Sequence, residues 1–114
     1  MEKLNVEKVG NVVVLKLVGD IEFDDSISVN EKFNDVIANV GSKIVLDLKE
    51  CAYVDSSGLG ALVEGLKNAQ KAGGDLRLCH LSEDFREVLM MTRTMKYFQV
   101  FDSVDKAIES FNVA

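Results

Sequence analysis

Hydrophobic residues along the chain form two patterns of spacing, which alternate. Short, nearly continuous apolar runs are typical of buried strands. Between these runs, apolar residues recur at every third or fourth position, as on one face of a helix. The strand-like runs are LNVEKV, VVVLKLV, KIVLDLKEC, DLRLCHL and a short stretch from Phe98 to Phe101. Gly10-Asn11, between the first two runs, predicts a tight hairpin turn.

A helix is expected after the second strand and after each later one. Ser28 and Glu31 have the spacing of a capping box near the start of the first helix. The helical segments are Ser26 or Ser28 to Gly41, the stretch from YVDSSGLG to Gly73-Gly74, a helix capped by Ser82, and Ser103 to Phe111. The order ββαβαβαβα predicts one α/β domain over residues 1–114, with a mixed, mostly parallel β-sheet and α-helices.

The composition narrows the class of protein. The chain has 114 residues, the size of a single domain, and 47% of them are hydrophobic. No apolar run approaches the length of a membrane span, and charged residues interrupt the N-terminus where a signal peptide would be apolar. We therefore expect a cytoplasmic protein without membrane association. The formal net charge of −6 disfavours nucleic acid as a partner, because its phosphates are also negative.

Few residues are candidates for metal binding. The acidic loop near residue 20 lacks the ligand spacing of an EF-hand, so we interpret it as solvated and favourable to the next helix. Cys51 and Cys79 are interpreted as reduced, mostly buried side chains. His80 follows Cys79 directly, and adjacent strand residues point to opposite faces, so this pair is not expected to bind metal. No cofactor is predicted. The acids of the loop are Asp20, Glu22, Asp24 and Asp25.

Motifs of common enzyme classes are incomplete in this chain. The paired serines at 56 and 57 lack the GxSxG pattern of a nucleophile elbow. Gly58 and Gly60 lack the third glycine of a dinucleotide-binding fingerprint, because Val63 stands in its place. We therefore expect a protein without enzymatic activity.

The stretch YVDSSGLGAL, from Tyr53 to Leu62, places two hydroxyl groups where a helix begins. Either Ser56 or Ser57 could cap the helix by accepting a backbone hydrogen bond, and Asp55 could do the same. At least one hydroxyl is then spare at a helix N-terminus, where backbone N–H groups and the helix dipole would stabilise a phosphate. Spacing alone does not decide which serine caps the helix and which serine could carry a phosphate.

The segment VDSSGLGALVEGLKNAQKAGGDLRLCHLSEDFREVL resembles the anti-sigma factor antagonist family, the STAS domains of bacterial partner-switching systems. The D-S-S-G-x-G motif is its most specific part. The resemblance implies a STAS-like fold and a phosphorylated serine directly after the aspartate, which is Ser56 here. It leaves Ser57 as the expected cap. The implied partners are an anti-sigma factor with serine-kinase activity, which is bound when Ser56 is unphosphorylated, and a serine phosphatase.

The resemblance also predicts a partner surface around the motif. The predicted contact residues are Asp20, Glu22, Asp55, Ser57, Gly58, Leu59, Gly60 and Glu64, with Ala61, Lys67 and Asn68 on the exposed side of the following helix. The two glycines of this set would let another backbone or a nucleotide phosphate come close. Two other roles remain open: a scaffold STAS domain, stressosome-like or in a lipid-transport complex, that is not a kinase substrate, and a weak nucleotide-binding module.

Two stretches depart from the family pattern. Gly19-Asp20-Ile21-Glu22 stands where G-E-L-D is common, so the acids are exchanged. Thr94 stands near the end of the third helix where a glycine is common, which predicts that this helix ends differently or runs on. Met90, Met91 and Met95 are expected to be partly buried and to fill gaps, although flexible methionine surfaces also serve adaptable binding.

Overall fold

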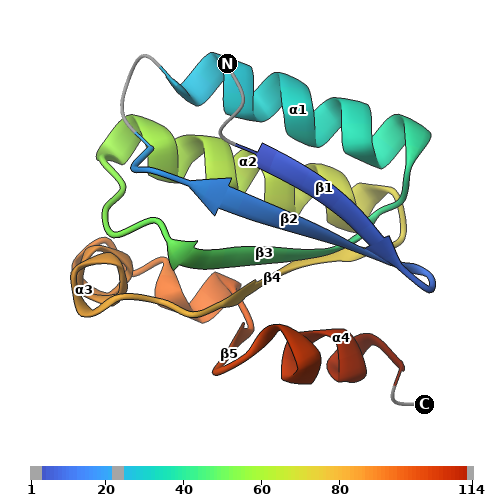
Figure 1. The fold of residues 1–114 in the computed structure, drawn as a ribbon. Helices are drawn as coiled ribbons and strands as arrows, with labels where there is room; N and C mark the ends of the chain where they lie inside the picture. The colour runs from blue at the N-terminus through green and yellow to red at the C-terminus, as the bar shows by residue number, and fades with distance from the viewer. Residues whose placement is uncertain (1–3, 22–24, 113–114) are drawn as a thin grey trace.

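The computed structural model describes residues 4–21 and 25–112 of the chain. These residues form a five-stranded sheet whose spatial order is the order of the sequence (Figure 1). The strands are β1 (Leu4–Val9), β2 (Val12–Val18), β3 (Lys43–Glu50), β4 (Asp75–Cys79) and β5 (Val100–Phe101). Only β1 runs antiparallel to its neighbour, and β2 to β5 pair in parallel. The predicted mixed, mostly parallel sheet is confirmed.

Helices cover both faces of the sheet. They are α1 (Ser26–Asn39), α2 (Ser56–Lys71), α3 (Glu83–Met91) and α4 (Val104–Asn112), with a 3₁₀ turn, η2 (Met95–Tyr97), after α3. In Figure 1, α1 and α2 lie together on one face, α4 lies against the other, and α3 lies beside the carboxyl ends of the strands. None of the helices within the described residues has the length and apolar character needed to cross a membrane.

The core has a large and a small part. The large part lies between the sheet and the helices α1, α2 and α3, and it includes Phe33, Leu62 and Phe85, all almost completely buried. The small part joins the sheet to α4, and it comprises Val12, Val14, Val45, Cys79 and Ala107 with the flanking Phe101, Val104, Ile108 and Phe111. The apolar stripe of α4 packs on this face of the sheet, and β2 has buried residues on both faces, as expected of an inner strand.

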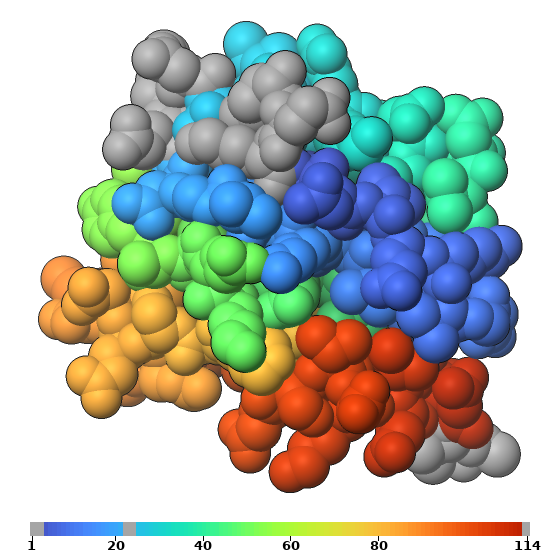
Figure 2. All heavy atoms as spheres, viewed as in Figure 1, coloured from blue at the N-terminus to red at the C-terminus, as the bar shows by residue number. Residues whose placement is uncertain are grey.

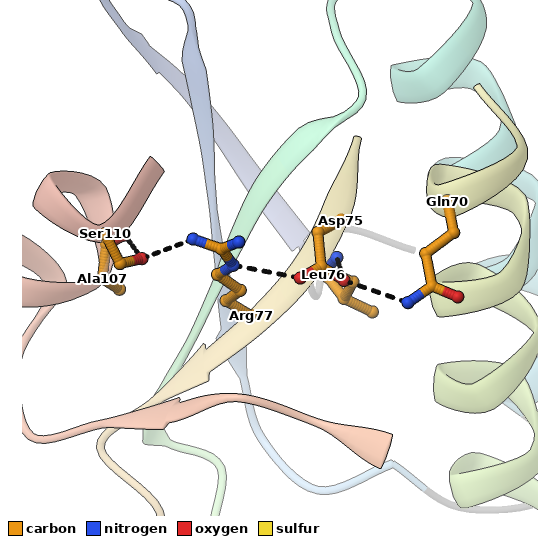
Figure 3. Close-up of polar contacts among 6 residues, drawn as sticks. All are labelled: Gln70, Asp75, Leu76, Arg77, Ala107 and Ser110. Carbon is orange, nitrogen blue, oxygen red and sulfur yellow. Dashed lines mark hydrogen bonds and ion pairs between the residues drawn. The ribbon is translucent and has the colours of Figure 1, made fainter. Parts of the chain in front are cut away.

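Arg77 of β4 connects α4 to the sheet (Figure 3). Its Nη1 donates to Ser110 Oγ at 2.8 Å, and its guanidinium lies 4.0 Å from the centre of the Phe111 ring. On the other side, Nε of Arg77 pairs with Asp75 at 3.0 Å, and Gln70 of α2 donates to the same carboxylate at 3.4 Å. One half-buried network therefore links α2, β4 and α4.

The first helix begins at one of the two predicted positions, but without the predicted capping box. Helix α1 starts at Ser26 with Asp25 in the N-cap position. Ser28 and Glu31 both lie within the helix, so the predicted capping box is wrong. The other end agrees with the prediction more closely, because the N–H of Gly41 still donates to Val36 O at 2.9 Å, two residues past the end of the helix at Asn39.

The third helix ends in a Schellman motif that contains no glycine. The N–H of Arg93 donates to Met90 O at 3.1 Å, and the N–H of Thr94 donates to Leu89 O at 2.9 Å. The residue in the left-handed conformation is Arg93, with φ of 60°, whereas Thr94 has φ of −97°. The threonine at position 94, where the family commonly has glycine, therefore does not extend the helix. The cost of a positive φ in a residue other than glycine falls on Arg93.

The methionines near this helix end do not share one environment. Met90 and Met91 are 63% and 76% exposed, so the expectation that they fill gaps in the core is wrong. Met95 does pack against the large core. Because α3 buries Phe85 and Leu89, its opposite side carries the two exposed methionines.

Replacing Arg93 by glycine should stabilise the protein. A glycine accepts a positive φ without the clash of a Cβ atom, so Arg93→Gly should raise the free energy of unfolding by up to about 1 kcal/mol in urea denaturation. The matched control is Thr94→Gly. This change should destabilise the protein, because Thr94 has a negative φ and its hydroxyl lies 2.8 Å from that of Thr92. A greater gain for Thr94→Gly than for Arg93→Gly would contradict this account.

Candidate functional site

The candidate site lies where the segment after β2 meets the segment between β3 and α2. Ile21 and Val54 form a parallel bridge, in which the N–H of Ile21 donates to Tyr53 O at 3.2 Å and the N–H of Asp55 donates to Ile21 O at 3.1 Å. Gly19 N donates to Glu50 O at 2.9 Å just before it. These bonds hold the D-S-S segment at the carboxyl end of β3.

Asp20 supports the same segment through its side chain. Its Oδ1 accepts hydrogen bonds from the backbone N–H groups of Ala52, at 3.2 Å, and Tyr53, at 3.1 Å. The predicted partner residue Asp20 therefore positions the loop that leads to the serines. Glu22, the other acid predicted for the partner surface, lies outside the described residues.

Asp55 caps α2. It has an extended backbone, with φ of −89° and ψ of 179°, and its Oδ1 accepts a hydrogen bond from the N–H of Gly58 at 2.8 Å. The expectation that Ser57 is the cap is therefore wrong, because both serines already lie inside the first turn. A carboxylate is well suited to this position, since its charge is stabilised by the positive end of the helix dipole.

The two serines differ in exposure. Ser56 is exposed and Ser57 is half-buried. Figure 2 shows that the green segment after β3 reaches the surface between the blue end of β2 and the orange segment that leads to α3. A modifying enzyme can therefore approach the hydroxyl of Ser56 more easily than that of Ser57.

The residues after the serines do not all face solvent. Leu59 is 5% exposed and Ala61 is 2% exposed, so both predicted contact residues have their side chains in the core. Gly58 is also buried, and a Cβ atom there would lie 2.6 Å from Ile21 Cγ2 and 2.8 Å from Val54 Cγ2. The lack of a side chain at Gly58 therefore serves packing against Ile21 and Val54, and not the approach of a partner backbone that the sequence suggests.

The exposed residues of α2 form a narrower surface than predicted. Gly60, Glu64 and Lys67 are exposed, and no atom would come within 4 Å of a Cβ at Gly60. Asn68 is half-buried, and its Nδ2 donates to Asn34 Oδ1 of α1 at 3.0 Å. One side of the first turns of α2 is therefore lined by the exposed residues Ser56, Gly60, Glu64 and Lys67. These residues remain the candidates for contact with a partner.

Both cysteines are buried, and neither forms a disulfide within the described residues, as the sequence predicts. Burial, with a smaller contribution from the charge of Asp47, raises the pKa of the Cys79 thiol to about 12. Cys79 and His80 do not point to opposite faces, which corrects the sequence-based expectation. The φ of His80 is 58°, and this left-handed residue interrupts the alternation of the strand.

Comparisons with known proteins agree with this architecture. The model of the STAS domain family matches residues 3–107. The chain belongs to the STAS domain family.

The chain is similar to proteins named as anti-sigma factor antagonists. It is 25% identical over 112 residues to the anti-sigma F factor antagonist of Paenibacillus polymyxa, with 97% of this chain and 96% of that protein covered. It is 32% identical over 80 residues to the anti-sigma-B factor antagonist of Bacillus subtilis (strain 168), with 70% of this chain and 72% of that protein covered.

The fold is also similar to solved structures of the anti-sigma factor antagonist SpoIIAA. The unphosphorylated form has a TM-score of 0.73 at 17% identity, and the alignment covers 97% of this chain and 99% of SpoIIAA. The phosphorylated form, from Bacillus, has a TM-score of 0.71 at 18% identity, and the alignment covers 95% of this chain and 98% of SpoIIAA. At this level of identity the likeness establishes the fold.

Removal of the cap should destabilise α2. Asp55→Ala should lower the free energy of unfolding by about 1 kcal/mol, because the N–H of Gly58 loses its acceptor. Asp55→Asn is the matched control, since asparagine caps helices about as well as aspartate. Urea denaturation checks both variants, and equal losses for alanine and asparagine would show that charge, and not the cap, is responsible.

The two glycines at the start of α2 should respond in opposite ways to alanine. Gly58→Ala should destabilise the protein by roughly 1–3 kcal/mol, because the new methyl group would collide with Ile21 and Val54. Gly60→Ala should stabilise it by about 0.5–1 kcal/mol, because the position is open and alanine favours a helix. Thermal unfolding of both variants tests the contrast, which would be refuted if Gly58→Ala were as stable as the unchanged protein.

Proposed function

We propose that this protein is an anti-sigma factor antagonist that is switched by phosphorylation of Ser56. In its unphosphorylated form it binds an anti-sigma factor with serine-kinase activity, and the bound sigma factor is released. Phosphorylation of Ser56 by that kinase ends the interaction, and a serine phosphatase restores it. The observation that carries the proposal is the exposed hydroxyl of Ser56 in the first turn of α2, next to a cap that another residue already supplies.

The helix can accept the phosphate without a change of fold. Backbone N–H groups in the first turn of a helix lack intrahelical partners, and the positive end of the dipole stabilises negative charge there. The carboxylate of Asp55 is already bonded to Gly58 N, so it keeps the cap while Ser56 carries the phosphate. The modified protein therefore retains α2 and its contacts with the bridge.

The phosphate weakens binding of the partner through its charge. The modification adds about −1.5 to −2 charges to a protein whose formal net charge is already −6. A partner that presents carboxylates or bound nucleotide phosphates to Ser56 is repelled. A loss of roughly 3 kcal/mol weakens binding more than a hundredfold.

The related proteins support this proposal. The relatives from Paenibacillus polymyxa and Bacillus subtilis are named as antagonists of anti-sigma factors. SpoIIAA is known in an unphosphorylated and a phosphorylated form, so a protein of this fold can carry the modification. A nucleotide-binding role receives less support, since the space beside Gly58 is filled by two core side chains.

Substitutions at the two serines test the switch. Ser56→Ala should bind the cognate anti-sigma kinase as the unphosphorylated protein does and should remain bound in the presence of ATP. Ser56→Asp should bind more than tenfold more weakly, because it places a charge at the same position. Ser57→Ala is the matched control, and it should still take up one phosphate and lose binding. Intact-mass spectrometry measures the phosphate, and isothermal titration calorimetry measures the affinity.

Each alternative has a distinct result. Stoichiometric phosphorylation of Ser56→Ala, lost in Ser57→Ala, would assign the switch to Ser57. A stable assembly with no phosphate on either serine after incubation with the kinase and ATP would favour a scaffold role. Affinity for labelled ATP or GTP without any protein partner would favour nucleotide binding.

A further inference from the structure

Asp47 of β3, Cys79 at the end of β4 and the adjacent His80 lie together, and none of them belongs to the serine motif. Asp47 and Cys79 are partners in the parallel register of the two strands, and His80 directly follows β4. One ligand atom from each side chain, namely a carboxylate oxygen, a sulfur and an imidazole nitrogen, lies within 4.8 Å of the other two. Three donor types from two strands therefore converge on one point.

The backbone of His80 creates this arrangement. In a regular strand His80 and Cys79 would point to opposite faces of the sheet. The positive φ of 58° at His80 changes the direction of its side chain, while its N–H stays bonded to Phe101 O at 3.3 Å. Histidine is among the residues that adopt this conformation more often than most.

The donor atoms have capacity for a further ligand. Asp47 Oδ1 accepts one bond, from Lys49 N at 3.1 Å. Among the described residues, neither the other oxygen of Asp47 nor the imidazole of His80 has a hydrogen-bond partner. Cys79 Sγ lies 3.7 Å from Leu46 O. Asp47 and His80 are partly exposed, whereas Cys79 is buried.

We propose that Asp47, Cys79 and His80 bind a divalent transition-metal ion of the zinc type. Ligands around a tetrahedral ion at 2.0–2.3 Å stand roughly 3.3–3.7 Å apart, so the three side chains need to close by about 1 Å. Thiolate and imidazole select zinc-like ions over magnesium and calcium, and water completes the fourth position. On binding, the S–H bond of Cys79 breaks, its proton passes to solvent, and a sulfur–metal bond forms.

Cobalt(II) is the probe for this site, because a thiolate bound to it gives a charge-transfer band in the near ultraviolet. The full-length, reduced, unphosphorylated protein is titrated with Co²⁺, and Zn²⁺ is then added. We expect a saturable band of one ion per chain that zinc abolishes. The absence of the band at millimolar cobalt would overturn the proposal.

Three variants assign the ligands. Cys79→Ser should abolish the band, while Cys51→Ser, which changes the other buried cysteine, should retain it. His80→Asn keeps a residue that tolerates positive φ but removes the imidazole. It should weaken binding by more than the 10- to 100-fold typical of losing an outer-shell partner. Unchanged affinity in His80→Asn, or a band that survives Cys79→Ser, would refute the site. Because these readouts need no partner protein, they are independent of the proposed switch at Ser56.

Discussion

The contact between Ile21 and Val54 is the constraint on which the functional end of this domain depends. Two backbone segments, one after β2 and one after β3, bond to each other there, and both side chains are completely buried. Helix α2 begins directly on this contact, because Gly58 has no side chain to separate it from the two residues. The position of Ser56 at the surface is therefore set by core packing two residues further along the chain.

Capping and the proposed phosphorylation involve neighbouring residues at this point. If a serine capped the helix, its hydroxyl would be engaged with a backbone N–H and a phosphate would have to break that bond. Asp55 supplies the acceptor instead, and Ser56 lies in the first turn with its side chain exposed. Under the proposed switch, phosphorylation of Ser56 would therefore leave the cap of the helix in place.

Much of the fold could be predicted from the sequence, because apolar periodicity reports which side of each element is buried. The periodicity does not report backbone conformation at single residues. For this reason the sequence leaves the cap open among Asp55, Ser56 and Ser57, and the family resemblance favours Ser57 over the observed Asp55. The left-handed Arg93 and the turned side chain of His80 are not predictable from periodicity either. The motif identifies the loop of the candidate site, but the exposure of each residue depends on the helical phase. One residue of error places Leu59 on the surface instead of in the core.

A rigid loop favours a switch that acts through charge and not through shape. The segment before Ser56 is held by the bridge and by the two backbone bonds to Asp20, so a phosphate has little freedom to rearrange it. If the shape stays constant, a partner distinguishes the two states only by the charge that it places opposite Ser56. Recognition must then reside in the exposed residues of the first turns of α2.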